Sequence, residues 1–379
     1  MFVLRLTERK IENMKRFLPV LLALALLLCA CGAPAPATDA TTEATQGTTA
    51  TPTTEPATEA TTEPVTEPTE EVIVEPVEYL YNPLSGEALD APYVGRVFAV
   101  TINNVEQALP HHGISQADIF FEMFINDYAT RGLALFSNVE EVESIGSVRS
   151  TRYNFTDLAM AYNLILCHAG ASNEVLGDLY SNGVDNMNVD GGIGYRDSYR
   201  YDVQDYAWEH CLFLDGEDAI EAAQEKEFDL EVSDKDYGMI FTEDGTPANG
   251  EDAAEVKIVF TLDGRTKNTK MVYDEEIGKY VYHQYGDMMV DENNNEPEAF
   301  TNVIVILAET ENVGVYHVAD LDGEGEGYYA CGGKIVKIKW VHEEETDPIT
   351  FFLEDGTPLQ QGIGSSYIAI APTDSPVEY

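Results

Sequence analysis

The sequence predicts an α/β domain with a mixed sheet at residues 79–235, followed by a mainly antiparallel β domain at 250–372. Two observations predict this order. In the first region, apolar runs typical of buried strands alternate with segments of helical apolar spacing. In the second, short β-branched and aromatic runs are separated by Asp-Gly turn signals. A long polar segment precedes both regions.

Residues 1–30 have the pattern of a lipoprotein signal peptide. Basic residues precede the apolar run FLPVLLALALLLCACG, which is shorter than the about 20 apolar residues that span a bilayer. Ala30 supplies the small residue that a lipoprotein signal peptidase requires before the cysteine. We therefore expect cleavage before Cys31 and lipidation of Cys31, so that fatty acyl chains such as palmitate anchor an extracytoplasmic protein to the cell membrane.

Residues 31–78 are predicted to be a disordered stalk. From residue 32 this segment contains 14 Thr, 7 Pro, 10 acidic residues and no basic residue. It lacks the apolar side chains that offset chain entropy, and its prolines and like charges favour an extended chain. A Thr/Pro segment can also carry O-glycans, and the sequence leaves that open.

The overall charge excludes one class of partner. The chain has 21 basic and 68 acidic residues, a formal net charge of −47. Such a surface repels nucleic acid and anionic lipid headgroups. The acyl chains are therefore the expected membrane contact, and no nucleic-acid partner is expected.

The first folded region is read from its apolar spacing. Buried strands are predicted at 97–102, 117–125, 131–137 and 164–168. Phe155, Leu158, Ala159 and Tyr162 recur at helical spacing, with Ser150 or Thr151 as the expected N-cap. Ser172 and Asp215 are the expected N-caps of two more helices, the first over about 173–181.

The second folded region contains eight strand-like runs. Their sequences are AEVKIVFT, KMVYDE, KYVYHQY, NVIVILAE, VGVYHVAD, KIVKIKWV, TFFLEDG and SSYIAIAP. Two acidic stretches, DLDGEGEGYYAC (320–331) and DENNNEPEAF (291–300), resemble calcium loops. Neither has the Glu that the EF-hand pattern needs at position 12, so we expect hairpin turns there.

The scarce arginines indicate a binding site. Between residues 31 and 225 every basic side chain is an arginine. Arg149 and Arg152 lie where a helix is predicted to begin, at the positive end of its dipole, so helix stability does not explain them. Helix N–H groups and paired guanidiniums suit an anion, and Arg196 and Arg200 of YRDSYR are expected to join the site.

The alternative is that these arginines pair with carboxylates of the protein itself. Acidic residues are far more numerous than basic ones. Asp118, Glu122 and Asp197 are examples of such partners.

Other polar residues give weaker signals. His168 ends a predicted strand, and ligands of α/β sheets bind beyond strand carboxyl ends. Cys167-His168 and His210-Cys211 resemble zinc ligands, but neighbours on a strand point to opposite faces, and no C-x-x-C or H-E-x-x-H motif occurs. We predict no metal site and no cofactor. Cys167, Cys211 and Cys331 allow at most one disulfide.

From residue 82 onward the chain resembles the YerB-like lipoproteins. The matching segments are RVFAVTINN, GISQADIFFE, TRGLALF, IGSVRSTR, HAGAS and YRDSYR. The resemblance implies a lipid anchor, an α/β first half and a separate C-terminal domain, and it implies no established reaction. One motif departs: the family pattern has a Pro-His-Asn turn after YRDSYR, whereas this chain has WEHCLF, with His210 in the place of the histidine.

Three functions remain open on the sequence. The leading hypothesis is a module that binds an anionic small molecule or envelope component through the arginines. The second is an envelope hydrolase or transferase with His168 or His210 as general base and Asp197 as its partner. The third is a scaffold that binds another envelope protein, which an exposed apolar patch on 250–372 would favour.

Overall fold

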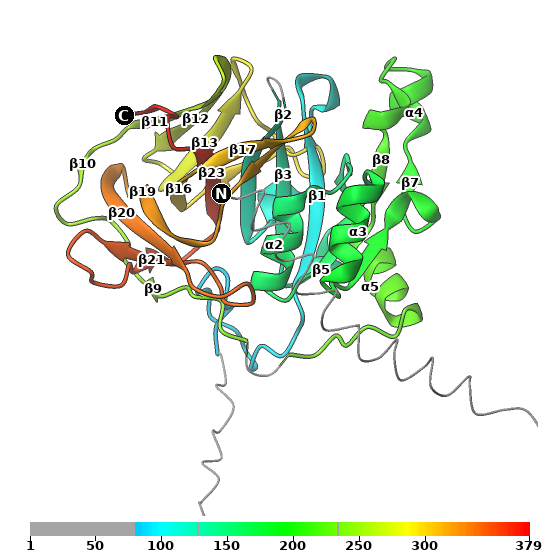
Figure 1. The fold of residues 1–379 in the computed structure, drawn as a ribbon, viewed down its shortest axis with the longest axis horizontal. Coiled ribbons are helices and arrows are strands. Elements are labelled where there is room, and N and C mark those ends of the chain that lie inside the picture. The colour runs from blue at the N-terminus through cyan, green and yellow to red at the C-terminus, as the bar shows by residue number, and fades with distance from the viewer. Residues whose placement is uncertain (1–79, 127–128, 233–234) are drawn as a thin grey trace, which may run out of the picture. The chain divides into compact units, whose positions relative to one another are not determined.

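The computed structural model describes residues 80–126, 129–232 and 235–379 (Figure 1). The predicted signal peptide, Cys31 and the predicted stalk lie outside these residues. Within the described ranges, no helix is long and apolar enough to cross a membrane.

One long mixed sheet contains strands from both halves of the sequence. Its order is β10-β20-β19-β16-β23-β2-β3-β1-β5-β6, with β21 paired to β20. β23 lies between β16 and β2 and is parallel to both. The strands are β1 (Phe98–Asn104), β2 (Ile119–Asn126), β3 (Ala129–Phe136), β5 (Ile165–His168), β6 (Asn186–Asn188), β10 (Glu251–Asp252), β16 (Asn302–Ala308), β19 (Gly323–Cys331), β20 (Lys334–His342), β21 (Thr350–Leu353) and β23 (Ser366–Pro372). The change in composition near residue 240 therefore marks a change in the type of element, while the sheet continues across it.

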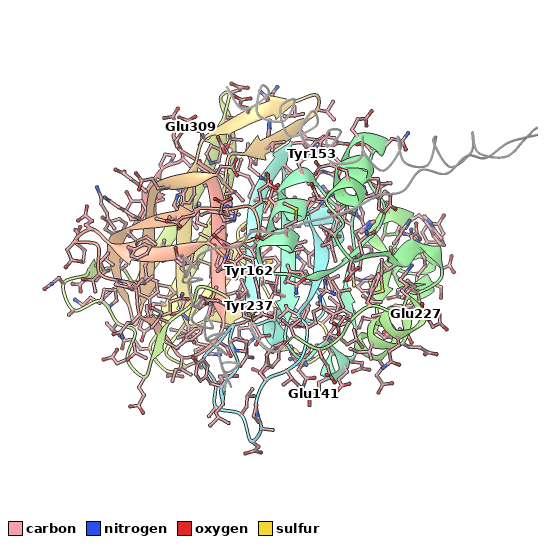
Figure 2. The ribbon with its side chains drawn as sticks, turned by 60° about the horizontal axis from the view of Figure 1, so that its bottom comes forward. Glu141, Tyr153, Tyr162, Glu227, Tyr237 and Glu309 are labelled. Atoms are coloured by element: carbon pink, nitrogen blue, oxygen red, sulfur yellow. The ribbon has the colours of Figure 1, made fainter. Side chains whose placement is uncertain are left out.

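The N-terminal half has the predicted α/β character. β1 is antiparallel to β3 and parallel to β5. Helices α2 (Tyr153–Ala161) and α3 (Asn173–Ser181) follow, and α2 lies against one face of the sheet (Figure 1). Tyr162, directly after α2, is fully buried, and its ring lies 6.0 Å from that of Phe121 on β2 (Figure 2). Successive residues of a strand point to opposite faces, so the neighbours of Phe121 serve a second core.

A second, antiparallel sheet packs on the opposite face, as expected for the C-terminal half. Its order is β14-β13-β12-β11-β24, with β15 paired to β13. Phe260 and Tyr282 from this sheet share a core with Phe120 of β2 and Tyr367 of β23. The strands are β11 (Glu255–Leu262), β12 (Arg265–Asp274), β13 (Lys279–Gln284), β14 (Asp287–Met288), β15 (Ala299–Phe300) and β24 (Val377–Glu378).

Smaller elements complete the fold. A hairpin is formed by β17 (Thr310–Val313) and β18 (Tyr316–Ala319), and a three-stranded sheet by β4 (Ile145–Gly146), β8 (Leu212–Leu214) and β7 (Tyr195–Arg196). β9 (Phe241–Thr242) pairs with β22 (Gln361–Gly362). Helix α4 (Ser198–Asp202), the 3-10 helix Trp208–His210 and α5 (Gly216–Glu225) belong to the N-terminal half.

The expectation of a turn over 320–331 was wrong for most of that stretch. Residues Gly323–Cys331 form β19, which pairs with both β16 and β20. A Cβ at Gly325 would lie 2.5 Å from the Trp340 ring, and one at Gly327 would lie 2.2 Å from the Val305 carbonyl oxygen. Glycine here allows close packing inside the sheet, although in sequence it reads as a turn signal.

The other acidic stretch forms a tight turn that docks on the N-terminal half. Asp291 is fully buried and accepts hydrogen bonds from the backbone N–H groups of Gly113 and Ser115, both at 2.9 Å. The Ser115 hydroxyl also donates to Asp291, at 2.7 Å. This carboxylate therefore stabilises the contact between the two halves of the chain.

Candidate functional site

The carboxyl ends of β1 and β5 carry the candidate site. The segment 149–151 bridges the two strands: the Arg149 N–H donates to the carbonyl of Thr101, in the middle of β1, at 2.9 Å, and the Thr151 N–H donates to the carbonyl of Gly170, just after β5, at 3.0 Å. Helices α2 and α3 begin directly after 152 and 172. Two helix N-termini thus lie at one edge of the sheet, where α/β proteins commonly bind ligands.

The two helix starts differ in how well the sequence predicted them. The Ser172 side chain caps α3 by accepting from the Val175 N–H at 3.4 Å, as predicted. The N-cap of α2 is Arg152, which makes no side-chain cap bond, so the prediction of Ser150 or Thr151 was wrong. Tertiary hydrogen bonds hold residues 149–151 across the strand ends, and the helix begins only after them.

Three arginines from two elements converge on the Ser150 segment; we call Arg131, Arg149 and Arg152 the arginine cluster. Arg131, on β3, is only 5% exposed, and its Nη1 donates to the Ser150 carbonyl at 2.7 Å. Arg152 Nη1 donates to the same carbonyl at 3.2 Å and to the Thr151 carbonyl at 2.7 Å. The carbonyls of Ser150 and Thr151 therefore hold the guanidiniums of Arg131 and Arg152 close together.

Two of the three arginines in the cluster have no carboxylate partner among the described residues. Within the described part of the chain, no carboxylate pairs with Arg131 or Arg152, and their buried Nε atoms have no hydrogen-bond partner. Arg149 pairs at 3.0 Å with Glu209, a side chain that is 55% exposed. Burial lowers the pKa of Arg131, and the charges of Arg152 and Arg149 lower this pKa further. An anion placed here would relieve both the repulsion and the unmet hydrogen bonding.

Aromatic and polar groups flank the arginine cluster on both sides. The guanidinium carbon of Arg152 lies 4.8 Å from the centre of the Tyr316 ring, on the β17–β18 hairpin. Tyr153 meets Tyr316 edge-on, with ring centres 6.4 Å apart, and Figure 2 shows Tyr153 beside that hairpin. On the other side, His210 Nδ1 lies 2.8 Å from Asn103 Nδ2. Burial lowers the pKa of His210, which favours its neutral form.

Arg196 and Arg200 are engaged elsewhere. Arg196 pairs with Asp190 at 2.7 Å and donates to the Trp208 carbonyl at 2.6 Å. Arg200 donates to the carbonyls of Ala108 and Pro110. The structure thus brings Arg149 and Arg152 together, as the sequence indicated, and adds Arg131 in place of the YRDSYR pair. The sequence alone does not reveal Arg131 as part of this site, because only the pairing of β3 with β1 places it opposite Asn103, near the end of β1.

The carboxylates considered as internal partners bind other groups. Asp118 accepts from the Asn82 side chain and the Ser137 N–H, both at 2.6 Å. Asp197 accepts from the N–H groups of Tyr199 and Arg200 and so caps α4. Glu122 is ion-paired with Lys267. These three carboxylates are therefore not the partners, but the wider alternative of internal pairing holds for Arg149 with Glu209 and for Arg196 with Asp190.

The structure does not join the residues of the predicted catalytic pair. His168 ends β5, is fully buried, and its Nε2 lies 3.3 Å from Asn186 Oδ1. Asp197 contacts the α4 backbone, and no hydrogen bond links it to His168 or His210 among the described residues. A histidine–carboxylate pair does occur, between His111 Nδ1 and Glu298 at 3.0 Å, but both side chains are 0% exposed.

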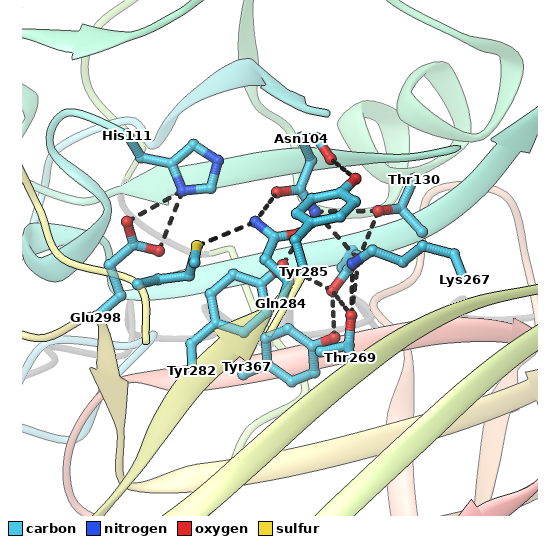
Figure 3. A network of polar contacts seen from close by, with 12 residues as sticks. Asn104, His111, Thr130, Lys267, Thr269, Tyr282, Gln284, Tyr285, Glu298 and Tyr367 are labelled. Atoms are coloured by element: carbon cyan, nitrogen blue, oxygen red, sulfur yellow. Dashed lines mark hydrogen bonds and ion pairs between the residues drawn. The ribbon is translucent and has the colours of Figure 1, made fainter. Parts of the chain in front are cut away.

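A second polar cluster lies between the two sheets (Figure 3). Glu122 on β2 is fully buried and accepts from Lys267 of β12, from the Tyr367 hydroxyl at 2.6 Å and from the Tyr282 hydroxyl at 3.0 Å. Burial opposes the charged carboxylate, but Lys267 and the hydroxyl donors outweigh burial and hold the pKa of Glu122 below its usual range. The Glu122 carboxylate is thus paired with a cation inside the protein, whereas no carboxylate among the described residues pairs with Arg131 or Arg152.

The lysines that line a surface hollow differ from Arg131 and Arg152, because each of them is paired with a carboxylate. The hollow, of about 440 Å³, lies on β11–β13. Each lysine that lines it has a carboxylate partner: Lys257 with Glu378 at 2.9 Å, Lys270 with Glu255 at 3.2 Å, and Lys267 with Glu122. The buried Lys267 thus has a carboxylate partner, whereas Arg131 and Arg152 have none among the described residues.

The three cysteines among the described residues form no disulfide. Cys167, Cys211 and Cys331 are all free and buried. No group of three or more His, Cys, Asp or Glu side chains that could hold a metal ion occurs in the described ranges.

Comparisons with known proteins place the chain in a family. The N-terminal domain of a protein of unknown function (DUF3048) matches residues 84–229, and the C-terminal domain of the same family matches 257–368. A Bacillus subtilis protein named "Putative lipoprotein YerB" is 25% identical over 311 residues, covering 76% of this chain and 88% of the relative. The crystal structure of YerB from the same organism has a TM-score of 0.67 at 24% identity, over 79% of this chain and all of that one. With both domains matched in order and a solved structure of the same fold, this chain belongs to the YerB-like DUF3048 family.

Proposed function

We propose that this protein is a membrane-anchored, extracytoplasmic lipoprotein that binds an anionic group of an envelope molecule at the arginine cluster. The lipobox at Cys31 and the name of the Bacillus subtilis relative support the anchor. One observation carries the binding site: Arg131 and Arg152 converge on one backbone segment, partly or fully buried, with no facing carboxylate among the described residues.

The physical argument is that such an arrangement is unfavourable without a ligand. Burial and mutual repulsion both lower the pKa of Arg131. A buried cation is normally paired, because leaving it unpaired costs several kcal/mol. Guanidinium forks bind phosphate or carboxylate bidentately, and two adjacent helix N-termini add N–H groups and favourable dipoles. The cluster is therefore suited to an oxyanion.

Calorimetric titration with inorganic phosphate tests this proposal on the chain from residue 32 onward, which retains every described residue. We expect saturable binding that weakens as ionic strength rises. At phosphate concentrations ten times Kd, the free energy of unfolding should rise by about 1.4 kcal/mol. Arg152→Gln should abolish both effects.

The matched control is Arg96→Gln. Arg96 is also an arginine of the N-terminal half, but it pairs with Asp185 at 2.5 Å. This variant should bind phosphate as the wild type does. Phosphate binding that survives in Arg152→Gln and in Arg131→Gln would contradict the proposal, as would the absence of binding by phosphate, sulfate and carboxylates alike.

A further inference from the structure

Exposed aromatic side chains gather beside the arginine cluster; we call Tyr199, Tyr201 and Trp208 the aromatic shelf. Their exposed fractions are 60%, 45% and 54%. They lie on α4 and on the 3-10 helix that follows it. The other tryptophan of the chain, Trp340, is only 2% exposed. Large exposed aromatic surface of this kind marks an interaction site.

Two rings of the aromatic shelf, Tyr201 and Trp208, are held in place before any ligand binds. The Arg196 guanidinium lies 4.8 Å from the centre of the Trp208 ring and is itself fixed by Asp190. Tyr201 meets Trp208 nearly perpendicularly, with ring centres 5.3 Å apart. A fixed side chain loses less conformational entropy on binding, so an exposed but held ring is well suited to contact a ligand.

The aromatic shelf is continuous with the arginine cluster. Glu209, the residue after Trp208, pairs with Arg149 at 3.0 Å. At the far side of the cluster, Arg152 lies against the Tyr316 ring. Figure 1 shows α4 and the β17 hairpin at the same end of the main sheet. Aromatic rings therefore flank the anion site on both sides.

This alternation of rings and guanidiniums favours one chemical class of ligand. The shelf residues carry polar tips, which suit a polar ligand better than an apolar peptide helix. The C–H face of a sugar ring carries partial positive charge and packs on the negative face of an aromatic ring. We propose that the ligand is an anionic glycan, with its charged group on the arginine cluster and a neighbouring sugar ring on Trp208. This inference rests on the proposed anion site.

The test compares four small probes by titration, with tryptophan fluorescence as a second readout. Glucose 1-phosphate carries ring and phosphate, N-acetylmuramic acid carries ring and carboxylate, glycerol 3-phosphate is an anion without a ring, and N-acetylglucosamine is a ring without charge. We expect one of the two charged sugars to bind more tightly than glycerol 3-phosphate and N-acetylglucosamine, and to change the emission of the exposed Trp208. Which charged sugar binds better identifies the anionic group.

Variants separate the ring contact from the anion contact. Trp208→Ala should weaken the charged sugar by about 2- to 12-fold, the range expected for loss of one aromatic contact, and leave glycerol 3-phosphate unchanged. Trp208→Phe, which keeps an aromatic ring, should retain most of the wild-type affinity for the charged sugar. Tyr180→Ala is the matched control, because Tyr180 is an aromatic residue of comparable exposure, 61% against 54% for Trp208, but lies at the opposite end of α3 from the site.

Each other outcome identifies what has failed. If glycerol 3-phosphate binds and Trp208→Ala leaves the charged sugars unaffected, the glycan inference is overturned while the anion site stands. If an acidic peptide binds more tightly than both charged sugars and depends on Trp208, the partner is a protein and the inference is overturned. If none of the anions binds, both the glycan inference and the proposed anion-binding function are overturned.

Discussion

Removing the buried lysine of the polar cluster in Figure 3 should destabilise the protein in a pH-dependent way. Lys267 and Glu122 are 3% and 0% exposed, and they connect β12 to β2. In Lys267→Met the carboxylate of Glu122 would remain buried without its cation. Breaking a buried pair in this way costs about 3–5 kcal/mol, because an uncompensated charge is left inside.

The pH dependence follows from the sign of the pKa change. In the wild type, Lys267 and the hydroxyl donors lower the pKa of Glu122 despite burial. In Lys267→Met, burial should instead raise this pKa above its unfolded value. The folded variant would then bind more protons than the unfolded chain, so its stability should fall as pH rises. The loss is expected to be larger at pH 8 than at pH 5.

Urea unfolding at pH 5 and pH 8 measures both effects. The double variant Glu122→Gln/Lys267→Met removes both charges, and it should be more stable than Lys267→Met at pH 8 because no uncompensated carboxylate remains. A free energy of unfolding for Lys267→Met within about 0.5 kcal/mol of the wild type at pH 8 would refute the reasoning. So would an equal loss at pH 5 and pH 8.

Two further predictions concern the partly buried His112 and the buried Gly216. Burial, with Arg200 nearby, lowers the pKa of His112 from 6.5 to about 4, so the unfolded chain binds more protons than the folded chain between these pH values. The free energy of unfolding should therefore fall by at most about 3 kcal/mol as the pH drops through this window. Urea unfolding of His112→Phe should show a smaller fall over the same window. Equal slopes in both proteins would contradict this. A Cβ on Gly216 would lie 1.8 Å from the Val139 carbonyl oxygen, so Gly216→Ala should lower the Tm by several degrees in a thermal melt, and an unchanged Tm would show that the loop moves aside.

Local signals predicted most elements of the fold. Ser172 caps α3 as its position before a helical pattern indicated, and the Asp263-Gly264 pair joins two antiparallel strands. These features depend on residues within a few positions of one another. β19 was missed because Gly325 and Gly327 fit against Trp340 and Val305 in other strands, and such contacts leave no local pattern.

The candidate site was predictable only in part, for the same reason. Arg149 and Arg152 lie three residues apart, so their proximity is visible in the sequence. Arg131 reaches them only through the pairing of β3 with β1. Arg196 and Arg200, although only four residues apart, are fixed by separate partners, and nothing in their spacing reveals this.

The position of β23 has a consequence for the order in which the sheet can assemble. This strand, near the end of the chain, pairs with β2 and β16, and its Tyr367 contacts Glu122 across 245 residues of sequence. For a chain delivered through a membrane pore N-terminus first, β2 keeps one open apolar edge until almost the last residue has passed. Open edges of this kind recruit foreign strands, and such distant pairings form slowly. Chaperones would therefore have to protect the open edge of β2 until nearly the whole polypeptide has been delivered. A product truncated before residue 366 would leave β2 and β16 each with one unpaired edge at the centre of the sheet.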